Sequence, residues 1–287
     1  MKSQSLLCNF GCCFTHLLFA LLGSWPFTVH AQHVHVNAGA TDTAQGAPLY
    51  FANGDTFDTS GTYDVYLTFA SSGSFSNLYQ GAGVTFTALA STPDNGGPAP
   101  GHAADGAFLQ LQFVSISGPV GGEFGVWMQE EGDPSTSYLL FALPVGTTNG
   151  TNLITLSESD GSPGMDPYGH IHGRTFTATK PGLYTLGCRV VDTSTNGTGG
   201  GSIHKPSSLY YFYFQAGFSI SSWVKNSELF SLTFGTTAGA TYYVESTPDL
   251  GSPNWTTFGG PFTGDNHLLT VSTNSTTPQL FFRLRSN

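Results

Sequence analysis

The stretch RTFTATKPGLYTLGCRVVD, residues 174–192, contains the clearest secondary-structure pattern in the chain. Apolar side chains occupy alternate positions in its second half: Tyr184, Leu186, Cys188 and Val190. Alternate side chains of a β-strand point to one face of the sheet, so this period of two predicts a half-buried strand over Gly182–Asp192. The preceding RTFTAT predicts a second strand, over Arg174–Thr179.

Similar runs recur along the chain, separated by turns rich in Gly, Pro and Asn. Further strands are expected at Thr62–Ala70, Gly83–Leu89, Phe108–Ser117, Gly122–Gln129 and Ser208–Gln215. Tyr184, placed just after Pro181-Gly182, is typical of the corner tyrosine of immunoglobulin-like sandwiches. Only 9% of the residues are charged, whereas glycine and phenylalanine are abundant. The sequence therefore predicts an all-β protein, an immunoglobulin-like or jelly-roll-like β-sandwich followed by a smaller one.

The first 31 residues are typical of an export signal. Lys2 supplies a positive start, an apolar stretch follows, and Val29-His30-Ala31 offers a cleavage site after Ala31. We therefore expect three segments: a signal peptide over 1–31, a first domain over 32–217 and a second domain over 223–287. The second should contain strands at Leu229–Phe234, Thr241–Ser246, Trp255–Phe258, His267–Ser272 and Gln279–Leu284. The mature protein would be secreted, in the periplasm, at the cell surface or outside the cell.

The charge of the chain argues against a nucleic-acid partner. Loss of Lys2 with the signal would change the formal net charge from −10 to −11, and an acidic chain repels phosphate backbones. No segment after the signal has the run of about 18 apolar residues that a membrane helix needs. Cleavage would leave Cys188 as the last cysteine, which excludes an intrachain disulfide and predicts a buried, inert thiol. The acidic run at residues 130–134 predicts a hairpin turn.

Two histidine pairs carry the functional prediction. His33 and His35 would open the first strand of the first domain, and His170 and His172 precede the strand at Arg174. At the spacing i, i+2, both rings of a pair project from one face of a strand, and neutral imidazole is a common ligand of zinc and copper. If the pairs converge, they would supply up to four ligands, and His204 is a candidate fifth. Affinity should fall as the pH drops through about 6.5, because the rings must be neutral to bind.

The histidine segment GHIHGRTFTATKPGLYTLGCRVVD also resembles the hallmark of a family of bacterial surface domains, the choice-of-anchor M or actinobacterial surface-anchored type. The opening HVHV and the central SGPVGGEFGVW are similar to two further segments of that family. The resemblance covers about residues 33–216, with His35 where the family usually has Asp. It implies metal binding and a partner at the cell surface or in metal transport.

The C-terminal segment resembles a small β-sandwich that often closes exported proteins of Verrucomicrobia and Planctomycetes. YYVESTPDL, Trp255 and FFRLR carry this likeness. It implies an accessory or cell-surface role without catalysis.

Other hypotheses for the function of the histidine pairs remain open. A structural or adhesive surface module without metal is the main alternative, and a metal-dependent enzyme is a lower one, since no acid–base group accompanies the pairs. Gly164 and His170 match the start of a cupin motif, but its following Glu is absent. A copper-binding histidine brace would need cleavage after Gln32 to expose His33. Asp166 is a candidate metal ligand, an acceptor whose hydrogen bond orients a ring, or a turn residue before Pro167, and His102 is a candidate extra ligand.

Overall fold

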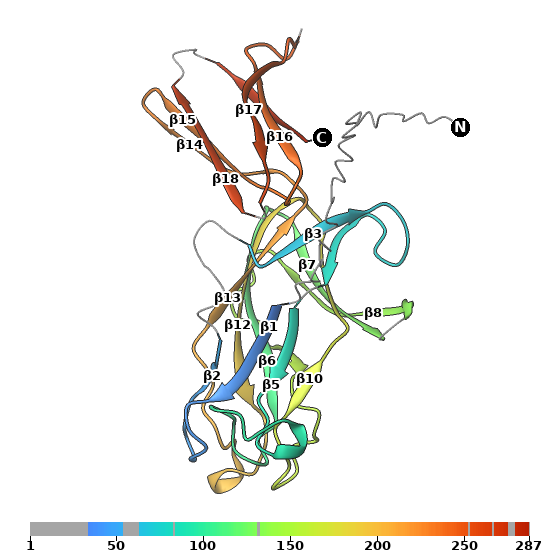
Figure 1. Cartoon of the computed structure of the whole chain (residues 1–287), viewed down its shortest axis with the longest axis vertical. Helices are drawn as coiled ribbons and strands as arrows, with labels where there is room; N and C mark the ends of the chain where they lie inside the picture. Colours follow the sequence, from blue (N-terminus) through green and yellow to red (C-terminus); the bar gives the residue numbers. More distant parts are fainter. Residues whose placement is uncertain are drawn as a thin grey trace, which may run out of the picture. The chain divides into compact units, whose positions relative to one another are not determined.

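A computed structural model provides the fold of the chain (Figure 1). The structure describes residues 34–53, 63–82, 84–130, 133–251, 253–265, 267–274 and 279–286. These residues form strands and two short 3-10 turns, η2 (Pro93–Asn95) and η3 (Thr198–Gly200), so the predicted all-β class is confirmed. In the same ranges, no helix is long and apolar enough to span a membrane. The predicted signal peptide, residues 1–31, lies outside the described residues.

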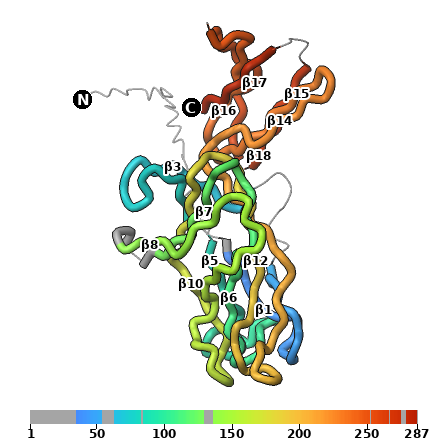
Figure 2. The backbone as a smooth tube through the Cα atoms, turned by 180° about the vertical axis from the view of Figure 1, so that it is seen from behind, coloured from blue at the N-terminus to red at the C-terminus, as the bar shows by residue number. Residues whose placement is uncertain are grey.

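The first sandwich consists of a small and a large sheet. Its strands are β1 (Val34–Ala40), β2 (Leu49–Phe51), β3 (Val65–Ala70), β4 (Leu78–Ala82), β5 (Val84–Ala88), β6 (Leu109–Ser117), β7 (Glu123–Glu130), β8 (Asp133–Pro144), β9 (Asn152–Thr155), β10 (Gly169–Ile171), β11 (Arg174–Ala178), β12 (Gly182–Asp192) and β13 (Tyr210–Ala216). The small sheet has the order β10-β5-β1-β2, and the large sheet has the order β8-β7-β11-β4-β3-β13-β12-β6-β9. The small sheet faces the viewer in Figure 1, and β7 and β12 of the large sheet do so in Figure 2.

Strand β12 has the alternation that its sequence predicts. The four apolar side chains named above are buried, and the positions between them are partly exposed except for Gly187. Tyr184 also makes the predicted corner contact: its hydroxyl donates to the Lys180 carbonyl at 3.0 Å and accepts from the Lys180 N–H at 3.3 Å. Because β12 hydrogen-bonds both β6 and β13, it anchors the large sheet.

Phenylalanine rings link the two sheets across a core that also contains many Val, Leu and Ala side chains. Phe86 of the small sheet meets Phe176 and Phe212 of the large sheet, with ring centroids 6.5 and 6.1 Å apart. Phe176 in turn packs on Phe124 and Phe214 at 5.9 and 4.9 Å. Each buried ring of this size contributes about 1.5–3 kcal/mol of hydrophobic stabilisation, so these contacts hold the small sheet against the large one.

The second sandwich has two three-stranded sheets, β14-β15-β18 and β17-β16-β19. Their strands are β14 (Ile220–Asn226), β15 (Leu229–Gly235), β16 (Thr241–Thr247), β17 (Thr256–Thr263), β18 (Leu268–Asn274) and β19 (Phe281–Ser286). Five of these strands overlap the predicted ones, although β17 runs to Thr263 where Phe258 was the expected end, and β14 is an additional strand. Ile220, at the start of β14 and just before the predicted boundary at residue 223, packs on the core of this sandwich.

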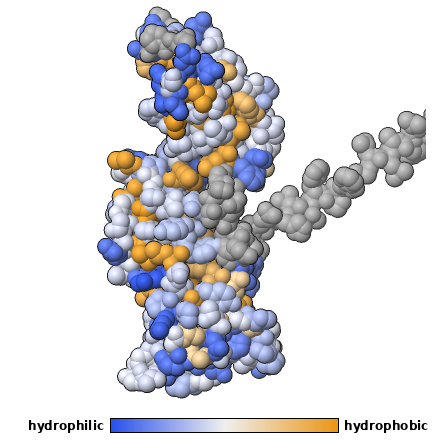
Figure 3. Space-filling model, turned by 90° about the vertical axis from the view of Figure 1, so that its left-hand side faces the viewer, coloured by the Kyte–Doolittle hydropathy of each residue, from blue (hydrophilic) through white to orange (hydrophobic). Residues whose placement is uncertain are grey.

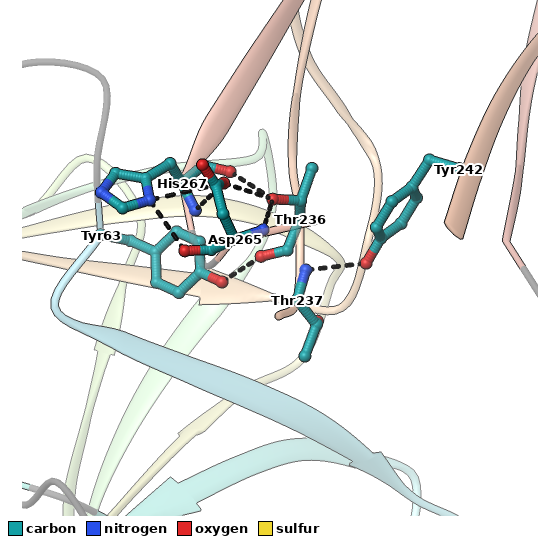
Figure 4. Close-up of polar contacts among 6 residues, drawn as sticks. All are labelled: Tyr63, Thr236, Thr237, Tyr242, Asp265 and His267. Atoms are coloured by element: carbon teal, nitrogen blue, oxygen red, sulfur yellow. Dashed lines mark hydrogen bonds and ion pairs between the residues drawn. The ribbon is translucent and has the colours of Figure 1, made fainter. Parts of the chain in front are cut away.

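Polar contacts connect the segment before β3 with loops of the second sandwich (Figure 4). The Tyr63 hydroxyl donates to the Thr236 carbonyl, and the Thr236 hydroxyl bonds to Asp265 at 3.3 Å. Burial raises the pKa of Tyr63 above its ordinary value, so the phenol remains a donor. The exposed side chains of His267 and Asp265 adjoin, with the His267 Nδ1 at 3.4 Å from a carboxylate oxygen of Asp265.

Five strands of the first sandwich were not predicted: β2, β4, β8, β9 and β10. Two of them, LYF and GHI, have only three residues, too few to show a period. β8 starts at the turn predicted for residues 130–134, and the pairing of Glu130 with Asp133 confirms that hairpin. Such strands form because a neighbouring strand offers them hydrogen-bond partners, which local sequence does not reveal.

Candidate metal centre

The small sheet brings the two histidine segments to one face. β1 runs parallel to β5 with His35 opposite Thr85, and β10 runs antiparallel to β5 with His170 opposite Thr87. Side chains paired across neighbouring strands point to the same side of a sheet. His35 and His170 therefore share the face opposite to the buried side chain of Phe86. The order β10-β5-β1 places one strand between the two histidine strands (Figure 1).

Three imidazole rings form a row on this face. The ring centroids of His35 and His170 are 5.1 Å apart with an interplanar angle of 59°. The centroids of His170 and His172 are 4.5 Å apart at 45°. His35 and His170 are partly exposed and His172 is exposed, so solvent reaches the row. We call these residues the histidine row.

The ring separations suit shared metal coordination. Metal–nitrogen bonds of about 2.0–2.1 Å in a tetrahedral site put two ring centroids about 5 Å apart. Neighbouring ligands of a square-planar copper site give about 4.5 Å. As the side chains stand, no three His, Cys, Asp or Glu residues of the described ranges form a metal-holding group. Coordination by the histidine row therefore requires its imidazoles to rotate about their side-chain torsions.

Two side chains hold the backbone under the row. The Asn53 amide donates to the His35 carbonyl at 2.6 Å and accepts from the Asn37 N–H at 2.9 Å. The Asn53 side chain thus supplies the hydrogen bonds that a neighbouring strand would make to β1 beyond the end of β2. On the other side, the His170 N–H donates to the Glu158 carboxylate at 2.9 Å. Both contacts restrict the backbone from which the rings project.

Asp166 organises the loop that leads into β10. Burial alone would raise the pKa of this carboxyl, but hydrogen bonds from Ser91, Thr92, Asn95 and Tyr168 outweigh burial and hold the pKa well below its usual range. The shortest of these bonds comes from the Thr92 hydroxyl, at 2.6 Å. Since its oxygens accept hydrogen bonds from the loop at residues 91–95 and from Tyr168, Asp166 joins two loops and is not a partner of the rings.

Thr87 adds an unusual polar group to the same sheet face. Its hydroxyl oxygen is buried and has no hydrogen-bond partner in the described chain. Thr87 lies between Asn37 on β1 and His170 on β10 in the sheet register. A buried hydroxyl without a partner is costly, by about 1–3 kcal/mol. A ligand or an ordered water at the row would remove that cost.

The remaining predicted ligands lie elsewhere. His33 is outside the described residues. His204 is 1% exposed, and its ring is occupied on both sides: Nε2 accepts from the Ala104 N–H at 2.9 Å, and Nδ1 donates to the Ala47 carbonyl at 3.1 Å. No ring nitrogen of His204 is left for a metal. The expected role of this residue as a fifth ligand is therefore replaced by a structural one.

Two further sequence-based expectations concern His102 and Cys188. His102 contacts its neighbour's carbonyl, Ala103 O, at 2.8 Å through Nδ1 and is not part of the histidine row. Cys188 is fully buried, and burial raises the pKa of its thiol well above the ordinary value, as expected for an inert thiol. Sequence reasoning missed Asn53 and Glu158. A single Asn or Glu without a spaced partner carries no local signal, because each acts here on backbone that is distant in the chain.

No protein-family model, curated protein or solved structure matches this chain.

Proposed function

We propose that this chain binds one transition-metal ion, zinc or copper, through His35, His170 and His172, for metal capture or delivery outside the cytoplasm. The observation that carries the proposal is the histidine row: two segments far apart in sequence bring their rings to centroid separations of 5.1 and 4.5 Å. His33 stays a candidate fourth ligand. A component of the cell surface or of metal transport would be the partner that receives the ion.

The ligand chemistry supports zinc or copper over other ions. Calcium and magnesium prefer several oxygen ligands, whereas the row offers imidazole nitrogens alone. The partial exposure of the rings suits a site that loads and releases its ion, in contrast to a closed structural site. The formal charge of −10 favours the approach of cations over a broad surface.

Metal titration of the metal-stripped full chain tests the proposal. Zinc and copper should each bind at one ion per chain, measured by competition with a chromophoric chelator. The electron paramagnetic resonance spectrum of bound copper should show nitrogen hyperfine coupling, because imidazoles would be the ligands. Failure of both ions to bind would contradict the proposal and favour the hypothesis of a structural or adhesive surface module.

Single substitutions then identify the ligands. His35→Ala and His172→Ala should each weaken zinc and copper binding, while His102→Ala and His267→Ala should not. His102 and His267 are suitable controls because each already has a backbone carbonyl at 2.8 Å from its Nδ1 and lies outside the row. Equal losses in the controls would indicate non-specific binding to histidine and contradict the proposed site.

A further inference from the structure

A pocket lies where the first sandwich continues into the second. Apolar residues are scattered over the surface of both sandwiches, so an exposed apolar side chain does not by itself mark a site (Figure 3). The pocket is different, because it is hollowed to a volume of about 400 Å³ and is partly open to solvent. Sites for small ligands are clefts of about 300–1,000 Å³ and often lie between domains. The pocket therefore has the size and the place of a ligand site.

The first wall of the pocket comes from the large sheet of the first sandwich. Pro119 follows β6, and Pro181 directly precedes β12, which begins at Gly182. A Cβ at Gly182 would lie 2.6 Å from Pro119 Cγ, so the proline ring packs directly on the glycine backbone. Leu183, the next residue of β12, is partly exposed and also lines the pocket. This wall therefore presents two proline rings and a leucine side chain.

The second wall carries hydroxyl side chains from the second sandwich and the segment before it. Ser222 on β14 lies opposite Thr233 on β15, so both side chains project from the face of this sheet that is opposite to the buried Leu232. The Ser221 hydroxyl donates to the Thr233 carbonyl at 3.2 Å and keeps its lone pairs as acceptors. Ser219 also lines the pocket, and its hydroxyl oxygen is buried without a hydrogen-bond partner in the described ranges. This wall therefore offers several donors and acceptors to a ligand.

The combination of the two walls indicates the class of ligand. None of the residues that line the pocket is charged, so a charged ligand would lose its hydration without gaining a counter-charge from them. A purely apolar ligand would leave the hydroxyl groups of the second wall without partners. A neutral sugar ring has an apolar face of C–H groups and an edge of hydroxyls, each of which both donates and accepts. Its face matches the first wall, and its edge matches the second.

We propose that this pocket binds a neutral sugar, with the apolar face of the ring on the first wall and its hydroxyl groups hydrogen-bonded to the serines and the threonine of the second wall. The site shares no residue with the histidine row, so metal binding and sugar binding can succeed or fail separately. Because the walls belong to both sandwiches, a bound sugar would contact both and stabilise their junction.

Backbone amide NMR of the full chain tests the proposal, with D-glucose, D-galactose and D-mannose as probes. At least one sugar should shift the amide signals of Gly118, Gly182 and Ser219 in a saturable way, with a Kd in the millimolar range because one ring makes few contacts. The amide of Gly199, in η3, is the internal reference and should not shift. The uronate of the tightest-binding sugar, which carries a carboxylate, should bind at least about tenfold more weakly. Absence of a saturable shift with all three sugars would overturn the proposal, and so would a uronate that binds as tightly as its neutral parent.

Two tryptophan variants of β14 locate the binding. Ser222→Trp should fill the pocket and remove the sugar-dependent shifts at Gly118 and Gly182, and the exposed position of Ser222 should leave the folded state intact. Val224→Trp is the matched control, because Val224 lies two residues further along the strand on the same face, is 60% exposed and does not line the pocket. It should bind the sugar like the unmodified chain. Ser222→Ala, which removes one hydroxyl, should weaken binding about threefold to tenfold. Unchanged binding in Ser222→Trp, or an equal loss in Val224→Trp, would contradict the assignment.

Discussion

The chain holds its histidines in two contrasting ways. His204 is 1% exposed, and both of its ring nitrogens bond to backbone groups of distant loops. The rings of the histidine row lie beside one another at the surface of the small sheet, at 5.1 and 4.5 Å. In His204, both ring nitrogens form hydrogen bonds that connect loops. In the histidine row, the ring nitrogens lie near one another where an ion can reach them.

The difference shows that residue type alone does not identify a ligand. His204 lies in a loop rich in glycine and serine, GGGSIHKPSS, and by sequence it is a candidate fifth ligand beside the two histidine pairs. The His204 ring differs in its burial. A buried ring must form hydrogen bonds with its polar atoms within the protein. The rings of the histidine row, which are partly or fully exposed, carry no such requirement.

The strongest test of this contrast is His204→Ala. Removal of the buried ring leaves the Ala104 N–H and the Ala47 carbonyl without partners and creates a cavity, so we expect a loss of about 3–5 kcal/mol of unfolding free energy. Urea denaturation measures this loss. Zinc affinity of the folded variant should be unchanged, and a marked loss of affinity at unchanged stability would reverse the roles given to the two histidine environments.

The complementary change is His170→Ala at the centre of the histidine row. Zinc and copper affinity should fall at least about 100-fold, or about 2.7 kcal/mol, because the shared ligand is lost. Chelator competition measures the affinity. The metal-free variant should keep its unfolding free energy within about 0.5 kcal/mol, as for most partly exposed positions. A large loss of stability without metal would make His170 a structural residue like His204.

Asp166→Asn examines the loop that leads into β10. The carboxylate accepts bonds from three backbone N–H groups, at 2.8, 3.2 and 3.0 Å, so its neutralisation should cost about 1–2 kcal/mol at pH 7. Because the pKa of Asp166 is depressed in the folded state, its contribution is present above about pH 4 and is lost as the pH falls through the folded value. Urea denaturation at pH 7 and pH 3 should show the difference between variant and parent shrinking at pH 3. An equal difference at both values would exclude the charged carboxylate as the cause.

The smallest effect is expected for Asn53→Ala. Loss of the amide that holds His35 O and Asn37 N should loosen one end of the row and weaken zinc binding about threefold to tenfold. Asn196→Ala is the matched control, since its amide bonds two loop carbonyls, of Gly106 and Gly161, both at 2.7 Å. The control should lose stability and keep its zinc affinity. Equal affinities in all three proteins would show that Asn53 does not position the site.

Much of the fold was predictable because half-buried strands carry a strict period. β6, β7, β11, β12 and β13 lie within a few residues of their predicted bounds. The corner contact of Tyr184 and the inert burial of Cys188 were also predicted correctly from the same strand. Sequence patterns did not predict the short strands β2 and β10 or the Ser/Thr-rich start of β8. Their extended shape comes from hydrogen bonds to neighbouring strands.

The site was predictable only in part. The spacing of His170 and His172 indicates two rings on one side of the chain, and their centroids lie 4.5 Å apart. The approach of His35 depends on β5, which is inserted between β1 and β10 and pairs in parallel with one and antiparallel with the other. No local pattern in either histidine segment specifies that strand order.

The sequence by itself determined the all-β class, the alternation of β12 and the presence of paired histidines, because these depend on periods of a few residues. Tertiary structure decided which histidines meet and which one has both ring nitrogens bonded to the backbone. Those outcomes depend on contacts between residues such as His35 and His170, which are remote in the chain and adjacent only after the sheets have formed. Side-chain chemistry is local, whereas proximity and desolvation are properties of the folded chain.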